Sequence, residues 1–564
     1  MITDTLSTIF MSTLQHLGVE NPDIHLEHPA ELSHGDYATN VAMRYAKELG
    51  SNPRELAEKI LEQIDIRAID EIESINIAGP GFINIQLSPL FFSQSLQTVI
   101  QQEDHFGKNQ NGTDKKVIVE YSSPNIAKPF TVGHLRSTII GDAVARLLHM
   151  SGWDVLRDNH LGDWGTQFGK LIVAIKKWGN EEALDTAEDP IKDLVALYVR
   201  FHDEAEKEPR LVDEGRAWFT RLEQGDAEAR RLWEKCIGWS MIEFQKVYDQ
   251  LGVDFDMKLG ESFFEDKMQT VIDDLKGKDF YRESEDAQLI FFPDEKYPPL
   301  MILKKDGSTL YATRDLATDK YRKQTWNPDL VINEVGAEQS LYFQQIFETE
   351  AMLGYFNRDQ RVHVKHGLFR FKEGKMSTRK GNVIWLQDVI NEAKERVVQA
   401  TEHEQKPELI HQIAIGAIKF NDLKRESHKD IVFDWDELLN LKGDSGPYLQ
   451  YTYARCKSVV SKSKEHLKDI RYEPHASRDI TDVDRLLYRF PEVIELATKE
   501  YAPHHVANYL LELARAFNSW YGTTQIIVED DKAGTLERVQ LVAAVATIIK
   551  NGLWVLGIEA PETM

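Results

Sequence analysis

The sequence predicts a multidomain α/β protein whose central domain is a doubly wound parallel sheet, preceded by an α+β domain and followed by an all-helical domain. Its 564 residues exceed the roughly 250–300 at which single hydrophobic cores stop growing. Alternating strand-like and helical patterns run from about residue 115 to 385, and strand signals almost vanish after Trp385. We therefore expect three domains, at 1–110, 111–385 and 386–564.

The first 110 residues combine helical and strand patterns. Apolar residues recur at helical spacing from Leu6 to Leu17 and from Val41 to Leu49. Asn52-Pro53 supplies a cap and a first-turn proline for a third helix. Strands are expected at 72–77 and 82–87, joined by a Gly-Pro-Gly turn. These patterns predict the N-terminal α+β domain.

The central domain begins with a strand, a loop and a helix. Val117 to Val119 form a short apolar run, as in a strand that is buried on both faces. Two prolines and an asparagine between Ser122 and Pro129 end the strand, and a helical pattern runs from Gly133 to Gly152. The first amides of a helix have no internal partner and carry the positive end of its dipole. A glycine at this position therefore indicates a nucleotide site.

The rest of the central domain repeats strand and helix with one interruption. Val155-Leu156 predicts a second strand, and the acidic, strand-poor stretch from Glu181 to Asp256 predicts a helical insertion. Strand-like runs return at 289–292 and 300–303, and residues 330–335 predict a further parallel strand. In a doubly wound sheet, ligands bind beyond the carboxyl ends of the strands.

Composition excludes several classes of protein. Hydrophobic content is 42% and charged content 28%, as in ordinary globular proteins, and no apolar run approaches the ~20 residues needed to cross a bilayer. Nothing at the N-terminus resembles a signal peptide. The two cysteines, Cys236 and Cys456, form no C-x-x-C pair, which argues against a disulfide framework or a cysteine-held zinc. We expect a cytoplasmic protein with no membrane partner and no structural metal.

The charge balance is uneven along the chain. A formal net charge of −25 argues against a nucleic-acid partner if only the total is considered. From Arg361 to Lys380, however, seven basic residues stand against the single acid Glu373. An acidic protein can therefore still hold a basic groove.

Two strings of residues identify a family. SPNIAKPFTVGHLRSTIIGD closely resembles the segment that carries the HIGH motif in class I arginyl-tRNA synthetases, with Thr131-Val132-Gly133-His134 in the four motif positions. FRFKEGKMSTRKGNVI resembles the KMSK loop of class I synthetases, with Lys375-Met376-Ser377 in its first three positions. Thr131 stands where a histidine is usual, and Thr378 stands where a lysine is usual.

The resemblance extends over the whole chain. HGDYATNVAM and GPGFINIQL resemble the N-terminal domain of bacterial-type arginyl-tRNA synthetases, and GPYLQYTYARC with the closing LERVQLVAAVATIIKNGLWVLGIEAPETM resembles their helical (DALR-type) anticodon-binding domain. It implies a Rossmann-type catalytic domain, and an N-terminal surface at Phe82 and Asn84 that contacts the tRNA elbow. A Phe82 buried in the core is the alternative.

The implied function is ATP-dependent ligation of L-arginine to its tRNA through an arginyl-adenylate, releasing pyrophosphate and AMP. Charge builds on phosphate oxygens in the first step, so preorganised cations and amide dipoles are needed. The catalytic candidates are Lys128, Thr131, Gly133, His134 and Lys375. The resemblance assigns ATP contacts to Pro124, Lys128, Thr131, Gly133, His134, Lys375, Met376, Ser377, Arg379 and Lys380. Mg²⁺ would accompany ATP, without a dedicated carboxylate cage in the protein.

Charge also argues for the amino-acid substrate. A guanidinium is a planar fork of donors that carboxylates receive well, so an arginine pocket should hold acids and no competing cation. Glu120 ends the first central strand. Tyr311 and Asp315 are four residues apart, so they share one face if a helix has started by Tyr311. The alternatives are a solvated Glu120, and an Asp315 that caps the helix or forms a salt bridge beside Arg314. The resemblance assigns arginine contacts to Glu120, Ser123, Asn125, His134, Tyr311, Asp315 and Gln339.

The implied partners are tRNA(Arg), L-arginine and ATP, and we expect a monomer. A cysteine-specific class I enzyme would need zinc-binding cysteines that this chain lacks, and the isoleucine, leucine and valine enzymes carry a large editing domain for which there is no room. The alternative from another class is a synthetase-like RNA-binding protein with impaired catalysis, which a charging assay distinguishes.

Overall fold

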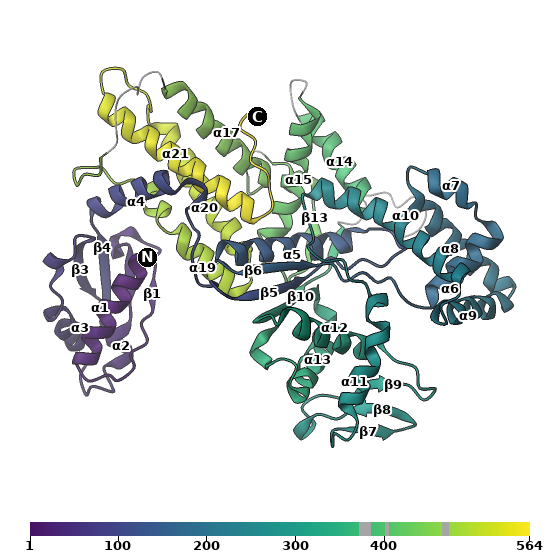
Figure 1. Ribbon diagram of the computed structural model, residues 1–564. Helices are drawn as coiled ribbons and strands as arrows, with labels where there is room; N and C mark the ends of the chain where they lie inside the picture. Colours follow the sequence, from purple (N-terminus) through teal and green to yellow (C-terminus); the bar gives the residue numbers. More distant parts are fainter. Residues whose placement is uncertain (372–384, 401–404, 441–442, 465–472) are drawn as a thin grey trace.

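The computed structural model describes residues 1–371, 385–400, 405–440, 443–464 and 473–564. Figure 1 shows an elongated molecule, with the N-terminal domain beside the C-terminal helices at one end and an insertion of helices at the other. The parallel sheet lies between them. No helix in the described ranges has both the length and the apolar character to span a membrane.

The N-terminal domain is an antiparallel sheet packed on helices. Its strand order is β1-β2-β4-β3, and Ile83, Ile85 and Leu87 on one face of β4 are buried in the core. Phe82 and Asn84 lie on the opposite face and are half-buried, so the alternative of a core Phe82 is wrong. The elements are α1 (Ile2–His16), β1 (Leu26–Glu27), β2 (Tyr37–Thr39), α2 (Val41–Tyr45), α3 (Pro53–Glu62), β3 (Ile72–Ala78), β4 (Phe82–Leu87) and α4 (Pro89–Gln102).

The central sheet has four strands, all parallel, in the order β11-β10-β5-β6. Val117 and Val119 on β5 belong to the core formed with α5, whereas Ile118 packs on the other side. Helices cover both faces, α5 one and α12 and α13 the other (Figure 1), which confirms the doubly wound sheet. The elements are β5 (Lys116–Glu120), α5 (Val132–Met150), β6 (Asp154–Asp158), α12 (Tyr311–Trp326), β10 (Leu330–Gly336), α13 (Ser340–Leu353) and β11 (Arg361–His366).

Two features of this region differ from the sequence prediction. The runs at 289–292 and 300–303 do contain strands, but these form a separate antiparallel sheet of order β7-β8-β9 and not part of the parallel sheet. Strand β11 was not predicted, because it is an edge strand in which valines alternate with charged residues. The bounds are β7 (Tyr281–Ser284), β8 (Ala287–Ile290) and β9 (Leu300–Leu303).

A group of helices includes the stretch from Glu181 to Asp256, for which the sequence predicts a helical insertion. It follows β6 and packs as a bundle at the right of Figure 1. Its elements are α6 (Thr166–Trp178), α7 (Glu181–Thr186), α8 (Pro190–Lys207), α9 (Arg210–Glu223) and α10 (Ala227–Leu251), after which a short 3-10 helix, η4 (Glu261–Lys267), and α11 (Met268–Leu275) lead to the antiparallel sheet.

Among its described residues, the C-terminal third is helical apart from one short parallel strand pair. The N-terminal domain docks on it: Asp36 pairs with Arg485, Glu492 accepts from Tyr37, and Tyr488 joins the N-terminal core. The elements are β12 (Phe369–Phe371), α14 (Leu386–Ala400), α15 (Pro407–Leu423), β13 (Ile431–Phe433), α16 (Trp435–Leu438), α17 (Gly446–Ser463), α18 (Asp482–Leu487), α19 (Phe490–Glu500), α20 (His504–Thr523) and α21 (Lys532–Val555).

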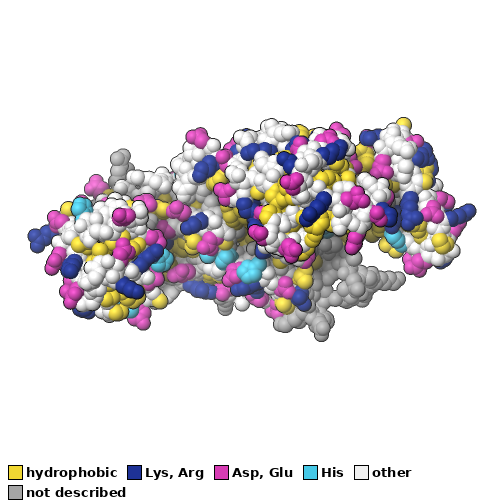
Figure 2. Space-filling view, turned by 90° about the horizontal axis from the view of Figure 1, so that it is seen from below, with side chains coloured by type: hydrophobic (Ala, Val, Ile, Leu, Met, Phe, Trp, Pro, Cys, Tyr) yellow, Lys and Arg dark blue, Asp and Glu magenta, His cyan; other side chains and the backbone are white. Residues whose placement is uncertain are grey.

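The surface charge is mixed on the face seen from below. Figure 2 shows Lys and Arg side chains interspersed with Asp and Glu over that face, with no large patch of one sign. The net charge of −25 is therefore not gathered there. On this face, recognition of an anion would have to come from a local arrangement of donors and cations.

Candidate functional site

The loop that follows β5 is held in an unusual conformation. Ser122, Ser123 and Ala127 have φ values of 69°, 42° and 57°, which is the left-handed region that side chains other than glycine rarely adopt. Hydrogen bonds fix the loop, since Ile126 N–H donates to the carbonyl of Gly162 at 3.1 Å. A Cβ at Gly162 would lie 2.6 Å from Asn125 Oδ1, so this close approach requires glycine. Strained loops of this kind cluster at ligand sites.

The loop ends at the predicted helix start. Thr131 is the N-cap of α5, and Gly133 follows in its first turn with an exposed backbone. The backbone N–H of Thr131 donates to His134 Nδ1 at 3.0 Å, and the Thr131 hydroxyl lies 3.1 Å from the same nitrogen. Because Nδ1 accepts a hydrogen bond, the proton of the neutral imidazole resides on Nε2.

His134 is neutral under physiological conditions. Burial lowers its pKa to about 4, and the positive charge of Lys128 acts in the same direction. Lys128 itself is exposed on the preceding loop. The helix start therefore offers a neutral imidazole donor and unpaired amides beside an exposed cation.

Acidic side chains gather around His160, which follows β6. The imidazole interacts electrostatically with the carboxylates of Glu120, Asp158, Asp163, Glu261 and Asp315. These carboxylates come from five separate segments: the ends of β5 and β6, the loop after β6, η4 and α12. The carboxyl edge of the sheet thus brings together the acids that a cationic substrate requires.

Burial raises the pKa of four of these acids, Asp158, Asp163, Glu261 and Asp315, and the shift is largest for the last two. Burial raises the pKa of Asp315 to about 6, although the Tyr342 hydroxyl donates to its Oδ2 and opposes the rise. Burial also raises the pKa of Glu261 to about 7, against the charge of Arg314 at 3.2 Å. Asp315 bonds Tyr342, and Arg314 pairs with Glu261 and Glu265, so the alternative of an Asp315–Arg314 pair is wrong.

Glu120 is buried and paired with a resident arginine. Only 9% of its surface is exposed, so the alternative of a solvated strand-end acid is wrong. Arg322 Nη2 lies 2.5 Å from Glu120 Oε2 and 2.5 Å from Asp158 Oδ2. Burial opposes ionisation of Glu120, but Arg322 outweighs it and lowers the pKa. The expectation of a pocket without a competing cation is therefore wrong, because buried carboxylates are held by buried guanidinium groups.

Several buried polar atoms near this edge have no partner among the described residues. They are Ser123 Oγ, Asn159 Oδ1 and His160 Nδ1, each from a loop at the carboxyl end of β5 or β6. Buried polar groups in native proteins are nearly always hydrogen-bonded. A polar ligand at this edge of the sheet could form hydrogen bonds with these unpaired atoms.

The remaining predicted residues lie at the same edge or beyond the described ranges. Tyr311 is 68% exposed at the start of α12, and Gln339 is exposed in η6 (Ala337–Gln339), which follows β10. Pro124 and Asn125 belong to the strained loop. The predicted residues Lys375, Met376, Ser377, Arg379 and Lys380 lie outside the described residues.

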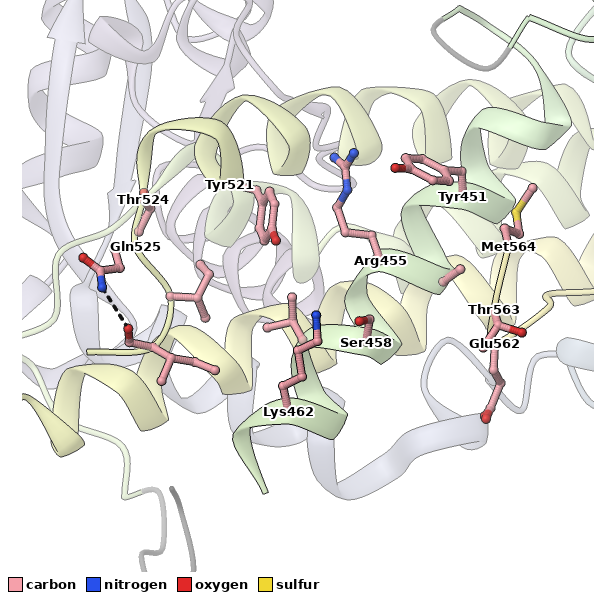
Figure 3. Close-up of a pocket in the computed structure, with 14 residues that line it drawn as sticks. Tyr451, Arg455, Ser458, Lys462, Tyr521, Thr524, Gln525, Glu562, Thr563 and Met564 are labelled. Atoms are coloured by element: carbon pink, nitrogen blue, oxygen red, sulfur yellow. Dashed lines mark hydrogen bonds between the residues drawn. The ribbon is translucent and has the colours of Figure 1, made fainter. Parts of the chain in front are cut away.

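A second candidate site lies in the C-terminal helices and was not predicted from the sequence. A cavity of about 630 Å³ is lined by Tyr451 and Arg455 of α17, Tyr521 of α20 and the C-terminal Met564. The Arg455 guanidinium lies 4.9 Å from the Tyr451 ring centroid and 5.3 Å from that of Tyr521. Figure 3 shows Arg455 between the two rings. Only the four-residue spacing on α17 was visible in the sequence.

The sequence led us to expect no structural metal, and the described residues were compared with the arrangements that hold metal ions. No group of three or more His, Cys, Asp or Glu side chains within the described ranges is arranged to hold a metal ion. Both cysteines are buried and free.

Family models match almost the entire chain. Residues 2–87 match the model "Arginyl tRNA synthetase N terminal domain", residues 95–435 match "tRNA synthetases class I (R), catalytic domain", and residues 449–564 match "DALR anticodon binding domain". The second candidate site falls within the third match.

Curated relatives and solved structures agree with these matches. The chain is 41% identical to the arginine–tRNA ligase of Clostridium perfringens over 558 residues, 97% of each chain, and 40% identical to that of Clostridioides difficile over 566 residues, 99% of each. The arginyl-tRNA synthetase structure of Plasmodium falciparum superposes with a TM-score of 0.84 at 27% identity, covering 100% of this chain and 99% of that one. The Thermus thermophilus structure, at 24% identity and a TM-score of 0.84, covers 100% of both and shows the same fold.

Proposed function

This chain belongs to the arginyl-tRNA synthetase family, and we propose that the carboxyl edge of its parallel sheet holds ATP and arginine for the first step of catalysis. Its reaction is the ATP-dependent ligation of arginine to tRNA. One observation carries the proposal. The N-terminus of α5, at Gly133 and His134, has free amides that can bind phosphate, and it lies at the same edge of the sheet as the acidic cluster around His160.

ATP binds at the start of α5. The free amides of the first turn and the Nε2–H of neutral His134 donate to phosphate oxygens, and the exposed Lys128 supplies positive charge. The other proposed ATP contacts are Pro124 and Thr131, together with the basic residues Lys375, Arg379 and Lys380 and their neighbours Met376 and Ser377 beyond the described ranges. Mg²⁺ enters with ATP as part of the substrate.

The first step forms an arginyl-adenylate. A carboxylate oxygen of arginine attacks the α-phosphorus, and the bond from that phosphorus to the pyrophosphate oxygen breaks. No proton is transferred, so no general base is required, and the protein acts by positioning and by stabilising the charge on phosphate oxygens. In the second step the 2′-hydroxyl of the terminal adenosine of tRNA attacks the arginyl carbonyl carbon, the bond from that carbon to the AMP oxygen breaks, and the hydroxyl proton passes to the departing phosphate of AMP.

Arginine binds in the acidic cluster. Asp315 receives the guanidinium, because its charge becomes favourable only when a cation enters, and Glu261, which already pairs with Arg314, adds negative charge beside it. Glu120, already paired with Arg322, contributes an oriented carboxylate at the strand end. Ser123, Asn125, His134, Tyr311 and Gln339 remain proposed contacts that surround the ligand at the sheet edge.

The cavity of about 630 Å³ between α17 and α20 takes an unpaired base of the tRNA anticodon. Proteins read single-stranded RNA by stacking splayed bases on aromatic rings and on arginine planes, which Tyr451, Tyr521 and Arg455 provide. Phe82 and Asn84, half-buried on one face of β4, are the proposed contact with the tRNA elbow.

The domain limits at 110/111 and 385/386, a monomeric state and a cytoplasmic location belong to the same proposal. Nothing favours the alternative of a catalytically impaired RNA-binding protein. Purified full-length protein charging total tRNA with arginine, and with no other amino acid, is the expected result. Asp315→Ala should abolish charging with arginine when ATP is kept at the concentration used for the wild type. A near-normal KM for arginine in that variant would exclude the proposed pocket.

A further inference from the structure

Arg136 lies one turn into α5, two residues after His134, and its side chain is 1% exposed. All of its guanidinium nitrogens donate hydrogen bonds. Nε and Nη2 bind the carboxylate of Asp422 on α15, at 3.0 Å each. Nη1 donates to the carbonyl of Gly367 at 2.7 Å and to that of Lys429 at 2.9 Å, and Nη2 donates to that of Ser427 at 2.9 Å.

The three carbonyls belong to the two loops that begin β12 and β13. Gly367 precedes β12, and Ser427 and Lys429 precede β13, its parallel partner. The loops approach so closely that a Cβ at Gly367 would lie 2.6 Å from the Lys429 carbonyl carbon. Arg136 therefore fixes the start of β12 relative to the first turn of α5.

Residues 372–384, called the basic segment below, are flanked on both sides by contacts to residues 130–136. Strand β12 ends at Phe371, and residues 372–384 follow in the sequence. Directly after residue 384, Trp385 pairs with Thr131 in an antiparallel bridge, and Leu386 N–H donates to the Phe130 carbonyl at 2.9 Å. Both flanks of 372–384 are thus bonded to residues 130–136.

We propose that Arg136 is a positioning residue for adenylate formation, because it sets the place from which the basic segment departs relative to the phosphate-binding start of α5. This inference rests on the proposed ATP site. Arg136 does not contact the substrates, and it acts through the carbonyls of Gly367, Ser427 and Lys429. A guanidinium is suited to this role because one planar fork can bind a carboxylate and three carbonyls at once.

A structural role for a buried arginine has to be separated from a positioning role. Removing Arg136 alone would leave Asp422 as an unpaired buried charge, which destabilises the fold. The double variant Arg136→Met with Asp422→Leu removes that charge while leaving the three carbonyl bonds broken. Two further variants test the same point: Arg136→Lys keeps the charge but lacks the fork, and Gly367→Ala forces the loops apart without changing any charge.

Arginine-dependent ATP–pyrophosphate exchange in the presence of tRNA, with ATP and arginine titrated separately, gives the decisive readout. In all three variants kcat/KM for ATP should fall about 100-fold, as for a misplacement of about 1 Å, while KM for arginine changes less than about threefold. The matched control is Arg478→Met, which removes an arginine that is 7% exposed and paired with Asp484 and Glu537. It should lower the unfolding temperature and leave KM for ATP unchanged.

A double-mutant cycle with Lys375→Ala tests whether Arg136 acts through the basic segment. The effects of Arg136→Lys and Lys375→Ala on kcat/KM for ATP should be strongly non-additive. Additive effects, or wild-type ATP kinetics in the folded variants, would overturn the inference. A failure of the proposed function is distinguishable, because the wild-type protein itself would then show no exchange with arginine.

Discussion

The affinity for arginine should fall steeply below pH 7, because two carboxyl groups of the proposed pocket hold protons there. Burial raises the pKa of Asp315 to about 6 and that of Glu261 to about 7. A guanidinium binds the ionised forms. Arginine must therefore displace protons at acidic pH, and its binding is linked to their release.

The size of the effect follows from the two pKa values. At pH 5 a group with a pKa near 6 is ionised about one tenth of the time, and one with a pKa near 7 about one hundredth of the time. The affinity at pH 5 should therefore be about 1000-fold lower than at pH 8, or about 4 kcal/mol. The sign is fixed, because raised carboxyl pKa values deprive the free site of charge at low pH, so binding strengthens as pH rises and levels off above about 7.

Isothermal titration of arginine into the full-length protein between pH 5 and 8 measures this dependence directly. Buffers of different ionisation enthalpy report the number of protons released, which should exceed one near pH 6. Glu261→Gln should remove about one unit from the slope of log Kd against pH, and circular dichroism confirms that the protein is folded at each pH. An affinity that stays constant from pH 5.5 to 8 would refute the assignment of both carboxyls to the arginine pocket.

Three further predictions concern other parts of the molecule. Thr131→Ala should lower the free energy of unfolding by about 1 kcal/mol, because it removes the side chain at the helix cap. Lys128→Ala removes a cation and should therefore lose far more exchange activity than Thr131→Ala; equal, small losses of activity in the two variants would contradict this. Arg455→Ala should raise the KM for tRNA in charging assays about tenfold or more, and an unchanged KM would exclude its cavity as a base-binding site. Arg485→Met leaves Asp36 buried without its partner, so limited proteolysis should release the N-terminal domain earlier than in wild type; identical cleavage rates would count against that docking contact.

The sequence was sufficient where local patterns decide the structure. The strand Val117–Val119 is apolar because it is buried on both faces, and Gly133 and Gly152 mark the two ends of α5 as predicted. Such signals depend on a few neighbouring residues. They survive in any tertiary context, so the sheet and the helix start could both be located without a structure.

The partners of the charged residues could not be predicted. Arg322 is 202 positions from Glu120 and Arg136 is 286 from Asp422, yet each pair shares a buried hydrogen bond. Nothing near these arginines in the sequence distinguishes a buried guanidinium from a solvated one. The expectation of an acidic pocket without cations failed for this reason, since the charge of Glu120 is kept in place by a guanidinium from a distant helix.

The cavity in the C-terminal helices escaped prediction for the same reason. Tyr451 and Arg455 lie on α17, but Tyr521 comes from α20 and Met564 from the end of the chain. Periodicity shows which face of each helix is apolar, not which two helices leave a gap between them. The family-model match adds the function of the domain, and only the structure brings these side chains together.

Thr131 stands where the usual motif has a histidine, and its hydrogen-bond contacts include His134. The Thr131 N–H donates to Nδ1, which leaves the imidazole proton on Nε2. Burial and Lys128 keep the ring neutral, with a pKa of about 4, so this turn contributes dipoles and not charge. Because Thr131 carries no charge and His134 is neutral, the positive charge needed by the triphosphate must come from Lys128 and from the basic residues that follow β12 in the sequence. Arg136 then gains its importance, because it links the start of that basic segment to the helix whose own donors are neutral.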